Sequence, residues 1–248
     1  MWTREYIKTR AKAVLKIIYW KAFAISLVLI LVGGDSGMGT SGSNIRGHNS
    51  NNVRGFIGQP GYDYEPYFNV ALFVIIFVIA VLLYRILVGY ALEVGGRRFF
   101  KQAAQMDVNM GYLGYAFKRE RYGNVTLTML YKGVLIFLWS LLLIIPGVIK
   151  SYAYSMVPYI LADNPNIGYS RAIQLSNQMT DGHKFDMWVL DLSFIGWYLL
   201  GLLLFYVGVL FVKPYENATK AELYLILRQN ALENAYCTSD ELLMENVI

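Results

Sequence analysis

The chain has 248 residues, of which 56% are hydrophobic and only 16% are charged. A soluble domain of this size carries about a quarter charged residues, so the composition favours a protein whose solvent is largely lipid. The formal net charge of +5 is explained in a membrane protein by cytoplasmic loops rich in Lys and Arg, which argues against a nucleic-acid partner. The lone Cys237 excludes an intrachain disulfide, and two histidines give no metal-ligand cluster.

Six segments are apolar enough to be candidate membrane spans, because a span needs about 20 apolar residues. They are residues 17–34, 69–92, 127–145, 147–162, 188–206 and 209–227, of which the last begins apolar and turns polar. No small-residue cleavage site precedes Gly33, so the first segment is interpreted as a retained span rather than a cleaved signal peptide. The sequence predicts one all-α, polytopic transmembrane helical bundle over 1–248 with six spans, five being the alternative count.

The long apolar stretch 127–162 contains a break. As one helix it would measure about 54 Å, nearly twice the roughly 30 Å hydrocarbon core of a bilayer. Pro146 disfavours a helical conformation for the residue before it, and Gly147 accepts turn dihedrals, so a helical hairpin is predicted there, a simple kink being the alternative. The run "GLLLFYVG", ending at Gly208, repeats "SLLLIIPG" 61 residues later and predicts a second hairpin.

Positive charges set the predicted orientation, because cytoplasmic loops carry an excess of Lys and Arg. Such residues gather before the first segment and within 93–126, which places the N-terminus in the cytoplasm and the Gly/Ser/Asn-rich, flexible loop 35–68 outside. Segments 93–126 and 163–187 are predicted to form cytoplasmic amphipathic helices, and 228–248 a cytoplasmic tail. In the first of these segments Phe99, Met106 and Phe117 fall on the apolar face, Lys101 falls off it, and glycines favour two shorter helices over one.

Polar residues at membrane depth are the candidate functional residues, since charges within spans are costly. The strongest cluster is Lys213, Glu216, Asn217, Lys220 and Glu222. If 209–227 spans, these side chains must face the bundle interior, a cavity or each other, and Glu216 and Lys220 are four apart, which allows pairing. The alternative is a helix lying along the interface. The remaining candidates, for which interfacial anchoring or capping is the alternative to a polar path, are Lys150, Tyr152, Tyr154 and Asp191.

Four stretches together resemble a known family. They are "GYAFKRERYGNVTLTML", "IIPGVIKSYAYSMVPYILADNP", "FDMWVLDLSFIGWYLLG" and "KPYENATKAELY". In order, over residues 90–230, they are similar to the bacterial membrane family called domain of unknown function 975. The resemblance implies a multi-pass membrane protein of Gram-positive bacteria, and it implies no activity that could assign a catalytic residue.

Two classes of function follow from the residues. The absence of nucleotide-binding, metalloprotease and hydrolase motifs and the surface helices favour a non-enzymatic scaffold or accessory subunit for export or envelope function. Its expected partners are the lipid bilayer of the plasma membrane and a membrane protein or a second copy of the chain. The alternative is a small transporter whose polar path is lined by the 213–222 cluster. A lipid-modifying enzyme ranks third, because no paired carboxylates or activated nucleophile are placed for it.

Overall fold

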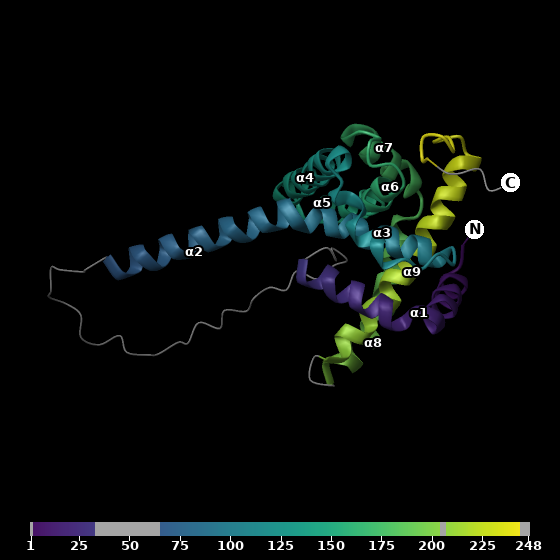
Figure 1. The fold of residues 1–248 in the computed structure, drawn as a ribbon, viewed down its shortest axis with the longest axis horizontal. Coiled ribbons are helices and arrows are strands. Elements are labelled where there is room, and N and C mark those ends of the chain that lie inside the picture. Colours follow the sequence, from purple (N-terminus) through teal and green to yellow (C-terminus); the bar gives the residue numbers. More distant parts are fainter. Residues whose placement is uncertain (1, 33–64, 204–206, 244–248) are drawn as a thin grey trace. The chain divides into compact units, whose positions relative to one another are not determined.

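The structure, a computed structural model, describes residues 2–32, 65–203 and 207–243. Every regular element in these ranges is a helix, including a π-helix (η1) and a 3-10 helix (η2) (Figure 1). In chain order they are α1 (Arg4–Val32), α2 (Glu65–Tyr84), η1 (Arg85–Gly89), α3 (Tyr90–Ala104), η2 (Met110–Phe117), α4 (Arg119–Leu142), α5 (Ile144–Ala153), α6 (Val157–Asp163), α7 (Tyr169–Met179), α8 (Lys184–Leu203) and α9 (Val207–Glu233).

The chain divides into two units, one of Met1–Asp35 with Arg85–Ile248 and the other of Ser36–Tyr84. The second unit contributes α2, whose apolar side chains from Val70 to Tyr84 are exposed, as lipid-facing side chains would be. The loop predicted at 35–68 lies outside the described residues except for its last four, which begin α2. All the contacts discussed below lie within the first unit.

Three helical stretches are long and apolar enough to cross a membrane: Arg4–Ile30, Val70–Ala104 and Arg119–Leu142. The predicted all-α fold and membrane-compatible helices are therefore confirmed, whereas six spans are not. Segment 147–162 is not one helix, since α5 and α6 measure only about 15 and 10 Å at 1.5 Å per residue. In 209–227 the charged residues of α9 lower the hydropathy, and the end of the 188–206 segment lies outside the described residues.

α4 and α5 form the first predicted hairpin, but its turn lies earlier than predicted. Leu143 interrupts the helix with extended dihedrals (φ −160°, ψ 144°), and α5 begins at the next residue. Pro146 therefore sits in the first turn of α5, where a missing N–H leaves no intrahelical hydrogen bond unmade. Gly147 lets the two helices approach closely, because a Cβ built there would lie 2.4 Å from Ser140 Oγ and 2.8 Å from Ser140 Cα.

α8 and α9 pack against each other as a second hairpin with the same close contact. A Cβ on Gly208 would lie 2.5 Å from Gly201 Cα. The pairs Ser140–Gly147 and Gly201–Gly208 occupy the same positions of the internal repeat, 61 residues apart. The repeat therefore corresponds to a structural feature: two hairpins, each with a small residue where the helices meet.

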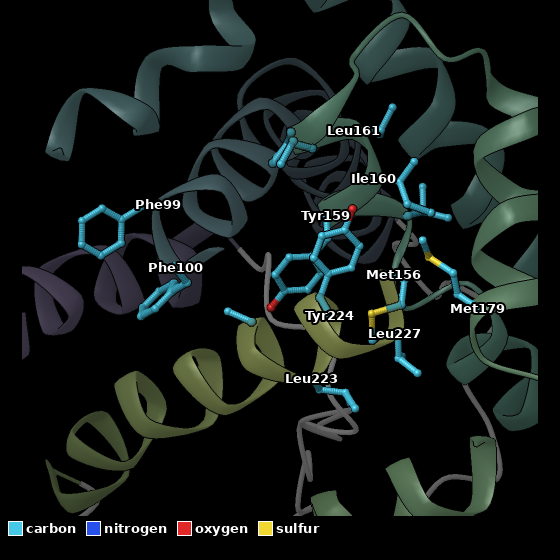
Figure 2. Close-up of a cluster of buried hydrophobic side chains, with 14 of the residues drawn as sticks. Phe99, Phe100, Met156, Tyr159, Ile160, Leu161, Met179, Leu223, Tyr224 and Leu227 are labelled. Atoms are coloured by element: carbon cyan, nitrogen blue, oxygen red, sulfur yellow. The ribbon is translucent and has the colours of Figure 1, made fainter. Parts of the chain in front are cut away.

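The core lies where α3, α6, α7 and α9 meet, with α1 packed across α9 and α3. At its centre the rings of Tyr159 (α6) and Tyr224 (α9) stack with centroids 5.0 Å apart (Figure 2). Segment 93–126 contributes to this core more than predicted. It does break into two helices, α3 and η2, but Lys101 is buried whereas Met106 and Phe117 are exposed, so the predicted apolar face is correct only for α3.

Candidate functional site

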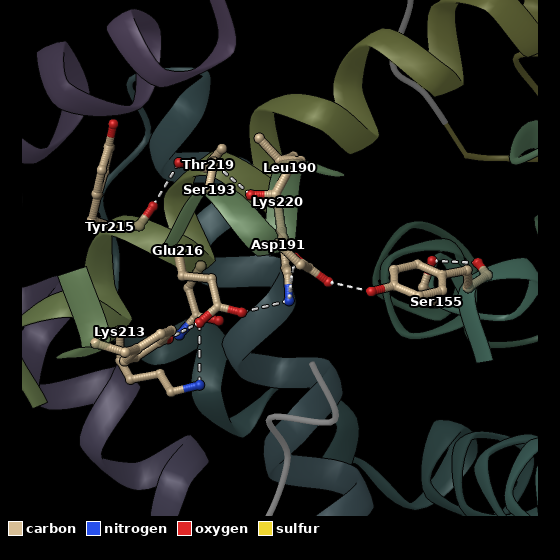
Figure 3. A network of polar contacts seen from close by, with 12 residues as sticks. Ser155, Leu190, Asp191, Ser193, Lys213, Tyr215, Glu216, Thr219 and Lys220 are labelled. Carbon is tan, nitrogen blue, oxygen red and sulfur yellow. Dashed lines mark hydrogen bonds and ion pairs between the residues drawn. The ribbon is translucent and has the colours of Figure 1, made fainter. Parts of the chain in front are cut away.

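Glu216 in the middle of α9 is the centre of a buried ionic network (Figure 3). Its side chain is only 4% exposed. Lys220 Nζ lies 2.6 Å from Oε1, Lys213 Nζ lies 3.2 Å from Oε2, and the Tyr198 hydroxyl of α8 donates to Oε2. The predicted Glu216–Lys220 pair is confirmed, and Lys213 joins the same carboxylate one turn before it.

The network continues from α9 to α8 and α5. Lys220 Nζ also lies 3.4 Å from Asp191 Oδ1, and the Tyr152 hydroxyl donates to Asp191 Oδ2 over 3.0 Å. Two carboxylates thus face two ammonium groups, so the formal charge of the network is balanced within the chain. We define this Glu216 network as Tyr152, Asp191, Tyr198, Lys213, Glu216 and Lys220; it joins three helices that the sequence separates by up to 68 residues.

Two other predicted residues of α9 face different neighbours. Asn217 is fully buried, donates to Ser26 Oγ of α1 over 3.0 Å, and accepts from Arg97 of α3 over 2.7 Å. Glu222 is also buried, and its Oε2 lies 3.0 Å from Nε of Arg10 in α1. The predicted 213–222 cluster is therefore not one site, because the helical turn sends Asn217 and Glu222 towards α1 and α3.

Lys150 and Tyr154 do not join the Glu216 network through any described contact. Lys150 Nζ lies 5.2 Å from the centroid of Trp139 and 5.8 Å from that of Tyr154, which are cation–π distances. Tyr152 and Tyr154 are both buried within the chain. α5, which carries Tyr152, packs against α4, α7 and α8.

A second buried cluster was not predicted from the sequence. Asp163, at the end of α6, pairs with Lys101 of α3, lies 3.2 Å from Arg228 NH1 and accepts the Tyr224 hydroxyl over 2.6 Å. We call these four residues the Asp163 cluster. The one signal in the sequence is the repetition of Glu93, Arg97 and Lys101 every four residues, which is also the pattern of a solvated helix face.

A third set of buried charges lies between η1, α3 and α4. Arg85 NH2 is 3.0 Å from Oε2 of Glu93, and Lys132 of α4 is 7% exposed within the electrostatic reach of Glu93. Together with the two clusters above, it shows that buried ionic contacts connect most of the helices of this unit. Buried charges of this kind are rare unless they are paired.

The segment after α9 is fixed to α7 by a salt bridge. Arg171 Nε lies 2.5 Å from Glu241 Oε1, and Arg171 also donates to the Tyr236 carbonyl over 2.7 Å. The hydrogen bond from Arg171 holds the pKa of Glu241 below its ordinary value. Cys237, within this segment, is buried, and burial raises the pKa of its thiol.

Chemically, the Glu216 network can hold helices together or pass protons along a row of phenol, carboxylate and ammonium groups. Within the described ranges 2–32, 65–203 and 207–243, no three His, Cys, Asp or Glu side chains are grouped as metal ligands.

Comparison with known proteins gives a single relationship. Residues 67–231 match the family described as "Protein of unknown function (DUF975)", and this range includes the Glu216 network, the Asp163 cluster and both hairpins. No curated protein and no solved structure matches the chain. Because the match covers well over half of the 248 residues, the chain belongs to the DUF975 family.

Proposed function

We propose that this chain is a non-enzymatic scaffold or accessory subunit of a bacterial plasma membrane, where it serves export or another envelope function. The observation that supports this proposal is the internal pairing of its buried charges. Glu216 has its carboxylate within hydrogen-bond or ion-pair distance of Lys213, Lys220 and Tyr198. A carboxylate so enclosed by its own chain is suited to fixing helix positions.

The proposed topology has six crossings or membrane-inserted segments, with the N-terminus and the C-terminal segment in the cytoplasm. The support is that Lys and Arg residues gather in the first half of α1 and in 93–126, and that the tip of the α4–α5 hairpin is apolar. Leu141, Ile144 and Ile145 at the first tip are 74%, 80% and 73% exposed, which water would not favour but lipid or a partner helix would.

The proposed partner is another membrane protein or a second copy of the chain, and site-specific photocrosslinking in cells tests it. A photoreactive residue at Leu199, which is 58% exposed on α8, is expected to give a discrete protein–protein adduct. The same residue at Leu190, buried on the same helix, is the matched control and should give none. The absence of protein adducts at Leu199, with crosslinks to lipid alone, would contradict the scaffold proposal.

A small transporter is the second candidate, favoured by one specific observation. Tyr152, Asp191, Lys220 and Glu216 follow one another at 3.0, 3.4 and 2.6 Å, close enough for proton exchange along the row. The discriminating measurement is the decay of a pH gradient in proteoliposomes holding the purified chain. Decay no faster than in protein-free liposomes supports the scaffold. Fast decay that Glu216→Gln abolishes, and that Glu233→Gln at an exposed site of α9 preserves, supports the transporter.

A further inference from the structure

A groove of about 750 Å³ lies between α1, α8 and α9, and its lining includes neither Glu216 nor Asp191. Its lining is almost entirely apolar, and six of its residues are Lys12, Trp197, Leu200, Phe211, Val212 and Tyr215. Trp197, Leu200 and Phe211 are exposed, so the groove opens to the surroundings of the protein. The volume falls in the range of about 300–1,000 Å³ that small-molecule sites occupy, and such sites are mostly apolar with a few polar groups.

One side of this groove carries an ordered row of positive charges. Lys8, Lys12 and Lys16 are four residues apart and therefore share one face of α1. Lys12 lines the groove, with its Nζ 5.7 Å from the ring centroid of Tyr215. Lys8, one turn earlier, donates from Nζ to Ser193 Oγ of α8 over 2.6 Å, so this face of α1 is turned towards α8 and α9.

Further along α1 the row changes from cationic to aromatic. The Tyr19 hydroxyl donates to the Phe211 carbonyl over 3.3 Å, and the ring of Phe23 stacks on that of Phe211 at 5.1 Å. Lys12 and Lys16 form no ion pair with a carboxylate within the part of the chain that the structure describes, and both are exposed. The groove thus has an uncompensated positive end and an apolar end.

From this polarity we propose that the α1–α8–α9 groove binds an anionic phospholipid, with an acyl chain along Trp197, Leu200 and Phe211 and the headgroup phosphate at Lys12 and Lys16. Basic pockets between membrane helices bind anionic headgroups in this way, and the acyl chain gains from each methylene that it buries. A neutral phospholipid would fill the same apolar space but would leave the two lysines without a counter-charge. The proposal does not depend on whether the chain is a scaffold or a transporter.

The test uses the fluorescence of Trp197, which lines the groove. In a variant that keeps this tryptophan and has the other four changed to Phe, brominated phosphatidylglycerol and brominated phosphatidylcholine are compared as quenchers. Each is added at the same minor mole fraction to phosphatidylcholine vesicles holding the full chain. Selective binding predicts apparent occupancy about 25-fold higher for the anionic quencher, since each of the two nearby lysines contributes about fivefold. A variant whose single tryptophan replaces Phe77, which is exposed on the apolar α2, should be quenched equally by both lipids.

Removing the charges of Lys12 and Lys16 tests whether these two residues select the anionic lipid. Lys12→Gln with Lys16→Gln should make the two quenchers equal at Trp197, whereas the control pair Lys118→Gln with Arg119→Gln, exposed at the start of α4, should preserve the difference. Native mass spectrometry of the wild-type chain and of the two double variants gives a second measurement that needs no tryptophan substitution. Equal quenching by both lipids in the wild-type background would overturn the proposal, and so would protection of Trp197 from both lipids, which a helix of a second copy in the groove would produce.

Discussion

At the scale of single residues, helical periodicity alone does not show which charged side chains are solvated and which are buried. Lys101 has the helical position expected of a solvent-facing residue, yet it is buried against Asp163. The partner lies 62 residues away in the sequence, at the end of α6. Helical period identifies faces, but the contacts between α3 and α6 decide which polar face becomes an interface.

Asp163→Asn should be among the most destabilising single changes in the chain. It removes the carboxylate that Lys101, Arg228 and Tyr224 share and leaves two cations buried without their counter-charge. Breaking a buried ion pair on one side costs about 3–5 kcal/mol. Tyr224→Phe removes one hydrogen bond from the same oxygen pair and should cost about 1 kcal/mol.

Thermal unfolding of the two purified variants in the same detergent gives the comparison. The midpoint should fall much further for Asp163→Asn than for Tyr224→Phe. Equal midpoints for the two variants would mean that the Asp163 cluster contributes packing rather than charge compensation.

Cys237 provides a sensor for the contact between the C-terminal segment and α7. Its thiol is buried and has a raised pKa, so a maleimide should label it slowly in the folded chain near neutral pH. Arg171→Gln removes both the salt bridge to Glu241 and the hydrogen bond to the Tyr236 carbonyl, and labelling should become severalfold faster. Mass spectrometry of timed samples gives the rates.

The matched control is Asp181→Asn, which breaks the exposed pair with Lys184 at 3.2 Å and should leave the labelling of Cys237 unchanged. If wild-type protein is labelled as fast as unfolded protein, the C-terminal segment is not held on α7 in solution.

At the scale of elements, the internal repeat corresponds to two helical hairpins whose helices meet at small residues. Gly208→Ala should destabilise the α8–α9 pair, because the new Cβ would meet backbone atoms of Gly201 at 2.5–3.1 Å, and a backbone cannot move aside as a side chain can. Gly196→Ala is the matched control within α8, since nothing lies within 4 Å of a Cβ there. Alanine is the better helix former by up to about 1 kcal/mol, so the control should be neutral or stabilising. Opposite shifts of the unfolding midpoint are expected; similar shifts would contradict the close helix contact.

The hairpins also show which features of the fold could be predicted from the sequence. The break in 127–162 was predicted correctly from its length, because no straight helix of that length fits a bilayer. The turn was predicted at Pro146–Gly147 but lies at Leu143. Pro146 instead begins the next helix, because proline is also well accommodated in the first turn of a helix. The second break, between Ala153 and Val157, was missed, although Pro158 in the first turn of α6 is a signal of a helix start. Its residues, including Tyr154 and Met156, are buried by tertiary contacts that no local pattern encodes.

The same limit applies to the site. Glu216 and Lys220 were paired correctly because both partners lie on one helix, where spacing predicts contact. The partners that join α9 to other helices, Tyr152 and Asp191, were candidates only as separate residues. Their meeting with Lys220 depends on how the two hairpins pack, which is a property of the assembled bundle.

At the scale of the whole molecule, the accessibility of single cysteines shows on which side of the membrane the ends of the helices lie. Because Cys237 is buried, topology is best measured in a Cys237→Ser background with new cysteines at exposed positions. Thr3 precedes α1, Lys118 precedes α4, and Tyr236 follows α9. The proposed topology places all three in the cytoplasm, so a membrane-impermeant maleimide should label none of them in intact cells and all of them after permeabilisation.

Labelling of Tyr236→Cys in intact cells, with Thr3→Cys protected, would require an odd number of crossings and would contradict the six-segment topology. A further cysteine at Ile144, the tip of the α4–α5 hairpin, separates two arrangements that both leave the termini inside. A hairpin whose tip reaches the outer surface is labelled there in intact cells. A hairpin that dips into the membrane and returns keeps its tip in lipid and unlabelled throughout. The exposed, wholly apolar run from Leu141 to Ile145 favours the second result, since such a tip is stabilised by hydrocarbon and not by water.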